Sequence, residues 1–399
     1  MSQETFKGNF TQQPALSEAA IESAVEVMRS GRLHRYNVAP GETPQVSLLE
    51  RELAEYLGVS FCLALASGGY AIQTALRAVD VGRDDAVLTN GFTLSPVPGA
   101  ISAVGAKPVL VDCTSDLVID LDDLVQKAKS SRARFLVVSH MRGHIVDMDA
   151  LMRVADELNL VVVEDCAHTL GASWAGVPSG NHGAVACYST QTYKHLNSGE
   201  GGFLTTNDPQ VIAKATLLSG SYMLYERHGT VPDPSVFDAI KLETPNCSGR
   251  MDNLRAAILR PQLAELSSAI EQWNSRYSRV AEQLEGVNRI ELPHRPAEEH
   301  FVGSSLQFRV ASFSNAQCEA LLAACEARGV ELKWFGRDEP VAFTSRYDSW
   351  RYVAAQSLPQ TDAALAQLFD MRIPLTFSLE DCALVGRIIV ECVGEVSRA

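Results

Sequence analysis

Three short segments of this 399-residue chain carry side chains whose types and spacing could do chemistry. In the first, Ser67-Gly68-Gly69, glycines let the backbone approach a ligand, and the N–H groups of a following helix favour an anion. The second, Glu164–His168, places Asp165 at the end of an apolar run, where strand ends meet ligands in α/β sheets. The third, Ser189–Lys194, leads into the glycine-rich turn Gly199–Gly202.

Each segment alone also has a structural explanation. The first fits a tight strand-to-helix turn, Asp165 fits a helix N-cap, and a lysine beside glycines is usually a surface charge. Their order along the chain favours chemistry, because an anion-binding turn, an acid, a hydroxyl and a lysine together describe a pyridoxal phosphate site. In such a site Gly68, Gly69 and Ser189 hold the phosphate. Asp165 pairs with the pyridine nitrogen, and Lys194 forms the Schiff base.

Composition and missing motifs exclude other classes. The sequence has no G-x-G-x-x-G, no G-x-x-x-x-G-K-[ST] and no H-E-x-x-H, which disfavours dinucleotide, P-loop and zinc-protease chemistry. A net charge of −14 disfavours nucleic-acid binding. No apolar run is long enough for a membrane span, and the first residues lack a signal-peptide pattern. Nine cysteines without C-x-x-C predict no disulfide framework, no metal site and a cytoplasmic enzyme.

The elements that must position these residues alternate strand and helix over roughly the first 270 residues, which predicts βαβ units on a mostly parallel sheet. Helical patterns at Tyr70–Val79 and Met148–Leu158 lie between the expected strands. Several of these runs are continuously apolar, as strands covered on both faces are. We expect seven strands, at Phe61–Ala66, Ala86–Asn90, Pro108–Cys113, Phe135–Ser139, Leu160–Asp165, Ala184–Tyr188 and Gly202–Thr206.

The pattern changes after about residue 250. One long helix or a pair is expected from Met251 to about Glu285, followed by a compact mixed tail. In this tail Ser304–Phe313 alternates like a strand, and Asn315–Arg328 and Leu379–Val393 are helical. We therefore predict two domains: a large cofactor-binding domain with the N-terminal segment, residues 1–265, and a smaller C-terminal α+β domain, residues 266–399.

The motifs resemble those of the DegT/DnrJ/EryC1/StrS group of fold-type I, pyridoxal phosphate-dependent aminotransferases, which mostly aminate keto-sugars attached to nucleotides. The likeness runs from about Gly31 to Leu266 and continues weakly into the tail. The acid-A-H stretch together with K-x-L-x-x-G-E-G-G is its most specific part. The supporting segments are LLERELAEYLGV, ASGGYAIQTAL, GAKPVLVDC, VVSHMRGHIVDMDAL, VVVEDCAHTLGASWAGVPSGNHG, YSTQTYKHLNSGEGGFLTTND and GRMDNLRAAILRPQL.

The resemblance implies roles for single residues. Lys194 would carry the Schiff base and then act as acid and base in the proton shift, and Asp165 would keep the pyridine nitrogen protonated. His168 would lie beside the phenolic oxygen, where the family has Gln or His. Ala167 would pack under one face of the ring.

Four departures surround the same expected pocket. Gly69 stands where the family has a hydroxyl, so one contact to phosphate is lost. Leu94 occupies the position of an aromatic over the cofactor, so the ring face is either merely apolar or covered by Phe92. Arg35-Tyr36-Asn37 replaces a common T-x-G, and Ser248 replaces an asparagine for which Asn246 is the alternative. These differences point to an unusual substrate or altered chemistry.

The resemblance also implies a homodimer with its sites at the interface, because the segment matching Asn246–Arg250 usually serves a neighbouring subunit's pocket. Its leading function is transfer of an amino group from an amino acid, glutamate or glutamine, to a keto-sugar or related carbonyl acceptor. A lyase, decarboxylase or dehydratase is the alternative, although Lys194 speaks against the dehydratases, which carry histidine there. A non-catalytic regulatory protein is the third class. The sequence does not identify the donor or acceptor.

Overall fold

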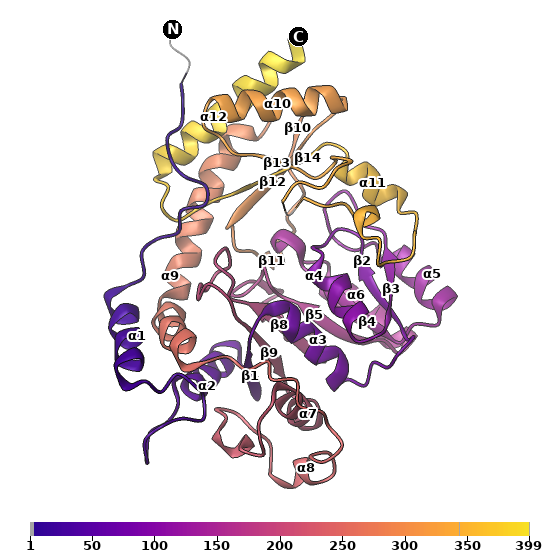
Figure 1. The fold of residues 1–399 in the computed structure, drawn as a ribbon. Coiled ribbons are helices and arrows are strands. Elements are labelled where there is room, and N and C mark those ends of the chain that lie inside the picture. The colour runs from indigo at the N-terminus through magenta and orange to yellow at the C-terminus, as the bar shows by residue number, and fades with distance from the viewer. Residues whose placement is uncertain (1–3, 343, 399) are drawn as a thin grey trace.

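The computed structural model describes residues 4–342 and 344–398 and places a seven-stranded sheet at the centre of the large domain (Figure 1). The strand order is β1-β9-β8-β5-β4-β2-β3. Only β9 runs against its neighbours, so the mostly parallel sheet predicted from the sequence is confirmed. The strands are β1 (Phe61–Leu65), β2 (Ala86–Asn90), β3 (Lys107–Val111), β4 (Phe135–Ser139), β5 (Val161–Asp165), β8 (Val185–Ser189) and β9 (Gly202–Thr206).

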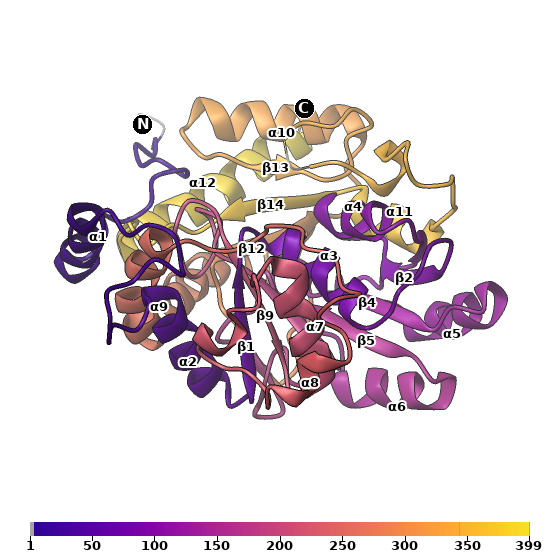
Figure 2. The same cartoon turned by 60° about the horizontal axis from the view of Figure 1, so that its bottom comes forward.

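Helices cover both faces of this sheet, which explains the continuous apolar runs of its strands (Figure 2). One face packs against α2 (Gln45–Leu57), α5 (Leu121–Ser131), α6 (Met148–Leu158) and the first half of α9 (Asn253–Leu284). The other face packs against α3 (Gly68–Ala78), α4 (Pro96–Ala103) and α7 (Pro209–Ser219). The helix α1 (Glu18–Ser30) lies along α9, and the short α8 (Ser235–Asp238) follows α7.

The C-terminal part has its own antiparallel sheet and its own core. Its strand order is β10-β12-β14-β13, from β10 (Ile290–Glu291), β12 (Ser305–Val310), β13 (Lys333–Trp334) and β14 (Leu368–Arg372). The second half of α9, α10 (Asn315–Ala327) and α12 (Leu379–Arg398) cover this sheet, while α11 (Pro359–Leu365) precedes β14. A three-stranded sheet of β6 (Ser173–Trp174), β7 (Val177–Pro178) and β11 (Glu299–His300) joins the two parts of the chain.

The expected elements differ from the observed ones mainly at their ends. All seven strands occur within about two residues of the predicted bounds, and the helix expected from Met251 is one continuous element, α9. Asp252 caps its start by accepting a hydrogen bond from the amide of Arg255. The predicted domain boundary at residue 265 falls inside this helix, so α9 contributes to both cores, and the division at that residue stays a prediction.

Candidate active site

Four strands of the central sheet end at one edge and deliver the predicted site residues there. The turn Ser67–Gly69 follows β1, Ser139 ends β4, Asp165 ends β5 and Ser189 ends β8. These strands all run in the same direction, so their carboxyl ends meet, which is where open α/β sheets bind ligands.

Gly202 brings two of these ends together. It lies on β9 opposite Leu65 of β1 and opposite Ser189 of β8. A Cβ atom at this position would lie 2.5 Å from the carbonyl carbon of Ser67 and 2.6 Å from the amide nitrogen of Gly68. Only glycine therefore lets the Ser67–Gly69 turn approach β9, which explains the last glycine of the G-E-G-G motif.

These ends surround a cavity of about 320 Å³. All seven residues predicted from the sequence to form the site line it. The set comprises Gly68, Gly69, Leu94, Asp165, His168, Ser189 and Lys194, and Ser139 and Ala167 complete the same wall. The chemistry of these groups fits pyridoxal phosphate, because the helix start at Gly68–Gly69 (the anion cradle), the carboxylate of Asp165 and the primary amine of Lys194 face one cavity.

The anion cradle lies at the start of α3. The Ser67 side chain accepts a hydrogen bond from the amide of Tyr70 and so caps the helix, while Gly68 and Gly69 are its first residues. The first amides of a helix have no carbonyl partner inside it, and the helix dipole favours an anion there. Gly68 must be small, because a Cβ atom would lie 2.8 Å from the Cβ of Ser189.

The carboxylate of Asp165 is fixed by two hydrogen bonds. Its Oδ2 accepts one from the Ser139 hydroxyl at 2.7 Å, and its Oδ1 accepts one from the amide of Ala167 at 3.2 Å. Ser139 in turn accepts a hydrogen bond from the Thr93 hydroxyl at 2.8 Å. Sequence reasoning missed Ser139, although its position at the end of a strand was a usable signal.

Lys194 lies next to His168, with 2.7 Å between Nζ and Nε2. The pKa of Lys194 is lowered from 10.5 to about 7, mainly by burial and also by the guanidinium groups of Arg142 and Arg372, against the opposing effect of Asp165. Burial, followed by the charges of Lys194 and Arg142, holds the pKa of His168 well below its usual value. Near neutral pH the lysine is therefore often an unprotonated amine, and the imidazole is neutral.

Sequence reasoning missed Arg142 and Arg372. Arg142 follows the end of β4 by three residues, so its position beyond a strand end was a signal that could have been used. Arg372 ends β14 in the C-terminal sheet, and no local pattern indicates that this strand end faces the large domain. Both residues line a small cavity together with Lys194.

The departures at Gly69 and Leu94 have distinct structural settings. Leu94 lines the main cavity, whereas Phe92 is buried against Phe335 in an edge-to-face contact, with ring centroids 5.1 Å apart. The cavity wall is therefore aliphatic at Leu94, and Phe92 is not among the residues lining it. At Gly69 a Cβ atom would lie 3.5 Å from the Cβ of Pro96, so ordinary space is available for a side chain there.

The residues at the departures 35–37 and 248 do not line this cavity. Arg35 is buried and forms two hydrogen bonds to Glu50, at 3.0 and 2.9 Å. Glu50 also accepts hydrogen bonds from the amides of Ala64 and Gly229, so this ion pair joins distant segments of the large domain. None of the residues Asn246–Arg250 lines the main cavity of its own chain.

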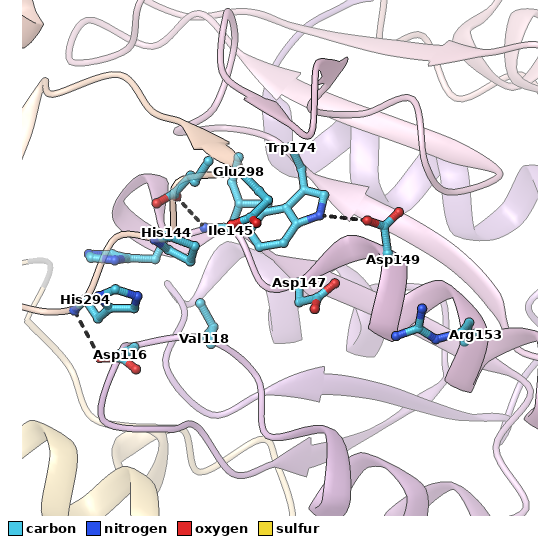
Figure 3. A pocket seen from close by; sticks show the side chains of 12 residues that line it. Asp116, Val118, His144, Ile145, Asp147, Asp149, Arg153, Trp174, His294 and Glu298 are labelled. Atoms are coloured by element: carbon cyan, nitrogen blue, oxygen red, sulfur yellow. Dashed lines mark hydrogen bonds between the residues drawn. The ribbon is translucent and has the colours of Figure 1, made fainter.

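A second cavity, of about 410 Å³, lies on another part of the molecule (Figure 3). Carboxylates and a tryptophan dominate the wall: the indole of Trp174 donates to Asp149, and the amide of His294 donates to Asp116. No lysine is among the described residues that line it. None of the site residues predicted from the sequence contributes to it, so it is not the predicted site.

His140, Glu164 and Cys166 also bring possible metal-binding atoms within 4.8 Å of one another. Glu164 already accepts hydrogen bonds from the amides of Gly180, His182 and Gly183. Burial alone would raise its pKa, but the hydrogen bonds from His140 and His182 outweigh burial and lower it. The buried carboxylate is thus accounted for as an anchor of the loop that precedes β8.

A family model described as the DegT/DnrJ/EryC1/StrS aminotransferase family matches residues 14–390. The chain belongs to this family. This membership confirms the family resemblance, and the match extends beyond residue 266 into the C-terminal domain, where the resemblance was weaker.

Individual relatives that the chain resembles carry transaminase or aminotransferase names. The chain is 33% identical over 252 residues to a dTDP-3-amino-3,4,6-trideoxy-alpha-D-glucose transaminase of Micromonospora megalomicea subsp. nigra, covering 62% of this chain and 64% of the relative. It is 30% identical over 278 residues to an L-glutamine:scyllo-inosose aminotransferase of Streptomyces griseus, covering 68% and 63%. The matches therefore span less than two thirds of these relatives' lengths. A structure of S. venezuelae DesV in complex with ketimine intermediate has a TM-score of 0.78 and 26% identity, covering 94% of each chain.

Proposed function

We propose that this family member is a pyridoxal phosphate-dependent aminotransferase that moves an amino group from an amino acid to a keto-sugar or related carbonyl acceptor. The observation that carries the proposal is the convergence of Lys194, Asp165, His168 and the anion cradle on one cavity. The names of the relatives support the substrate classes: one is a transaminase of a nucleotide-linked sugar and another uses L-glutamine with an inosose. Glutamate and glutamine are the donors we expect.

The residues of the cavity fit the cofactor part by part. Pyridoxal phosphate, when bound, supplies an aldehyde that condenses with primary amines and a ring that accepts the electrons released at the substrate carbon. Gly68, Gly69 and Ser189 would hold its phosphate, and Asp165, fixed by Ser139, would hold a proton on the ring nitrogen. Leu94 and Ala167 supply the apolar contacts expected beside the ring.

Lys194 is suited to both covalent attachment and proton transfer. An amine must be unprotonated to attack a carbonyl, and burial together with the two nearby arginines lowers the pKa of this lysine to about 7. A group with a pKa near the working pH also moves protons most effectively in both directions. His168, at 2.7 Å from Nζ, orients the amine and can share its proton.

Half-reactions test this function. L-glutamate or L-glutamine alone should convert the bound cofactor from its aldehyde to its amine form, with loss of absorbance at about 400–430 nm, and a keto-sugar should restore it. Release of carbon dioxide or ammonia without an acceptor would instead support the lyase or decarboxylase alternative. A protein that binds no cofactor would support the regulatory class.

We further propose a homodimer whose sites lie at the interface. The support is the family likeness of Asn246–Arg250, which lines no part of the main cavity of its own chain. Apolar side chains are exposed in the same region, including Tyr222, Met223 and Leu242, the last with 83% of its surface accessible. Sedimentation should show a dimer, and a mutation that separates the subunits should remove activity. Fully active monomers would contradict the proposal.

A cytoplasmic location remains part of the proposal. All nine cysteines in the described residues are free thiols, and eight of them are buried, which is usual for proteins of a reducing compartment. In the part of the chain that the structure describes, no helix has the length and apolar composition of a membrane span. Cell fractionation tests the location.

A further inference from the structure

A small cavity of about 30 Å³ shares two lining residues, Lys194 and His168, with the main cavity. A buried water needs about 10–15 Å³ of such space, so about two or three oxygen-sized atoms fit. The cavity therefore suits a small polar head group of a substrate bound at Lys194 and is too small for a sugar ring. Two arginines, Arg142 and Arg372, form part of its wall.

Arg142 is held rigidly at this cavity. Its backbone adopts φ 58° and ψ 22°, a left-handed conformation that residues other than glycine seldom adopt. Its guanidinium donates to Oδ2 of Asp370 at 2.9 Å, and Oδ1 of Asp370 accepts a hydrogen bond from Gln307 at 2.7 Å. Such uncommon backbone conformations persist where the surrounding structure enforces them, often at ligand sites.

Arg372 is held by a different contact. It ends β14 opposite Ser305 of β12, and its guanidinium carbon lies 3.7 Å from the centre of the Tyr193 ring. Stacking on an aromatic face fixes the plane of the guanidinium. Because Tyr193 directly precedes Lys194, the stack places this cation beside the reactive lysine.

The charges around the cavity favour an anion. Two guanidinium groups and the hydroxyls of Ser304 and Ser305 line it, and no Asp or Glu is among the described residues of its wall. The carboxylate of Asp370 pairs with Arg142 outside this wall, so the positive charge left facing the cavity comes chiefly from Arg372. An arginine fork matches the two oxygens of a carboxylate in geometry and charge. The effect of both arginines on the pKa of Lys194 supports their closeness to its amine.

We propose that Arg142 and Arg372 bind the carboxylate of the amino-acid donor, and of the 2-oxo acid it becomes, next to the carbon that reacts at Lys194. This inference rests on the proposed aminotransferase function. A keto-sugar acceptor without a carboxylate gains nothing from these arginines. The pair therefore selects the donor class, while other residues select the acceptor.

The test measures binding and half-reaction separately. Isothermal titration calorimetry with glutarate is carried out on the protein reconstituted with pyridoxal phosphate. Glutarate has two carboxylates but no amino group and no ketone, so it binds without reacting. Arg372→Gln should weaken glutarate binding about 10- to 100-fold, the scale of a lost charge-assisted hydrogen-bond pair. Glutaramide, the neutral counterpart, should bind weakly to every variant. Arg309→Gln is the matched control, because Arg309 lies on neighbouring β12 but pairs with Glu291 outside the cavity.

The same variants are then compared in the donor half-reaction. Arg372→Gln should raise the half-saturating concentration of L-glutamate by the same factor, with a much smaller change in the limiting rate and none in the acceptor KM. If Arg142→Gln does not fold because Asp370 loses its partner, Arg372→Gln carries the test alone. Unchanged glutarate and glutamate affinities in Arg372→Gln would overturn the subsite and leave the aminotransferase standing. Glutarate binding that depends on Arg372 without any half-reaction would support the subsite and refute the proposed function.

Discussion

Replacing Lys194 by methionine should stabilise the protein without cofactor, and the gain should shrink as the pH rises. Burial and the neighbouring guanidinium groups lower the pKa of Lys194 from 10.5 to about 7, so the folded state binds fewer protons than the unfolded state between these values. Stability of the unsubstituted protein therefore increases with pH across this window. The free-energy cost of burying Lys194 in the folded protein is fully present below pH 7 and is gone above about pH 10.5.

The magnitude follows from the two pKa values. One pKa unit corresponds to about 1.4 kcal/mol, so the lysine costs at most about 4 kcal/mol at pH 7 and about 2 kcal/mol at pH 9. Lys194→Met removes this cost and adds a constant term for its apolar side chain. Calorimetric unfolding of the apo forms at several pH values measures the difference, with exposed Lys129→Met as the control for the substitution. A difference that stays constant or grows from pH 7 to 10 would refute the reasoning.

Three further substitutions test other parts of the site. Asp165→Asn should keep the cofactor attached but slow the half-reaction on the order of 10²-fold, because the charge that keeps the ring nitrogen protonated is lost. An unchanged rate would refute that role. His168→Ala should lower the rate of the half-reaction less than Asp165→Asn does, since the contact of His168 to Lys194 orients the amine without being required for attachment of the cofactor. A larger loss of rate than in Asp165→Asn would assign His168 an essential proton transfer. Gly202→Ala should weaken cofactor binding and destabilise the fold by about 1–3 kcal/mol, because the new Cβ atom would collide with the Ser67–Gly69 turn. In the control Gly82→Ala the nearest neighbour of the new Cβ atom lies at 3.4 Å, so neither effect is expected. Equal effects of the two substitutions would contradict the packing argument.

The sequence was sufficient for the residues that local pattern fixes. Asp165 and Ser189 end apolar runs, and Gly68 follows one, so a parallel sheet necessarily brings them to one edge. The seven strands were predictable for the same reason, and their bounds differ only by the residues at which pairing with a neighbour starts or stops. Lys194 was identified by its motif and order rather than by any element, because it lies in a turn after β8.

Contacts between distant segments could not be predicted. Arg142 and Arg372 meet at Lys194 only because β14 of the C-terminal sheet ends against the large domain, and no local periodicity encodes that docking. Whether Phe92 replaces Leu94 at the cavity depended on the position of Phe335, more than 200 residues away in the sequence. The lowered pKa of Lys194 also depends on distant segments, because burial and the guanidinium groups of Arg142 and Arg372 produce it.

The most direct test of the account is to find which residue binds the cofactor. The protein is incubated with pyridoxal phosphate, reduced with borohydride, digested and examined by peptide mass spectrometry. The account predicts one phosphopyridoxyl group per chain, on Lys194, in the unsubstituted protein and none in Lys194→Ala. Before reduction, only the unsubstituted protein should show an absorbance band near 400–430 nm. A label on a different lysine, or undiminished amino transfer by Lys194→Ala, would contradict it.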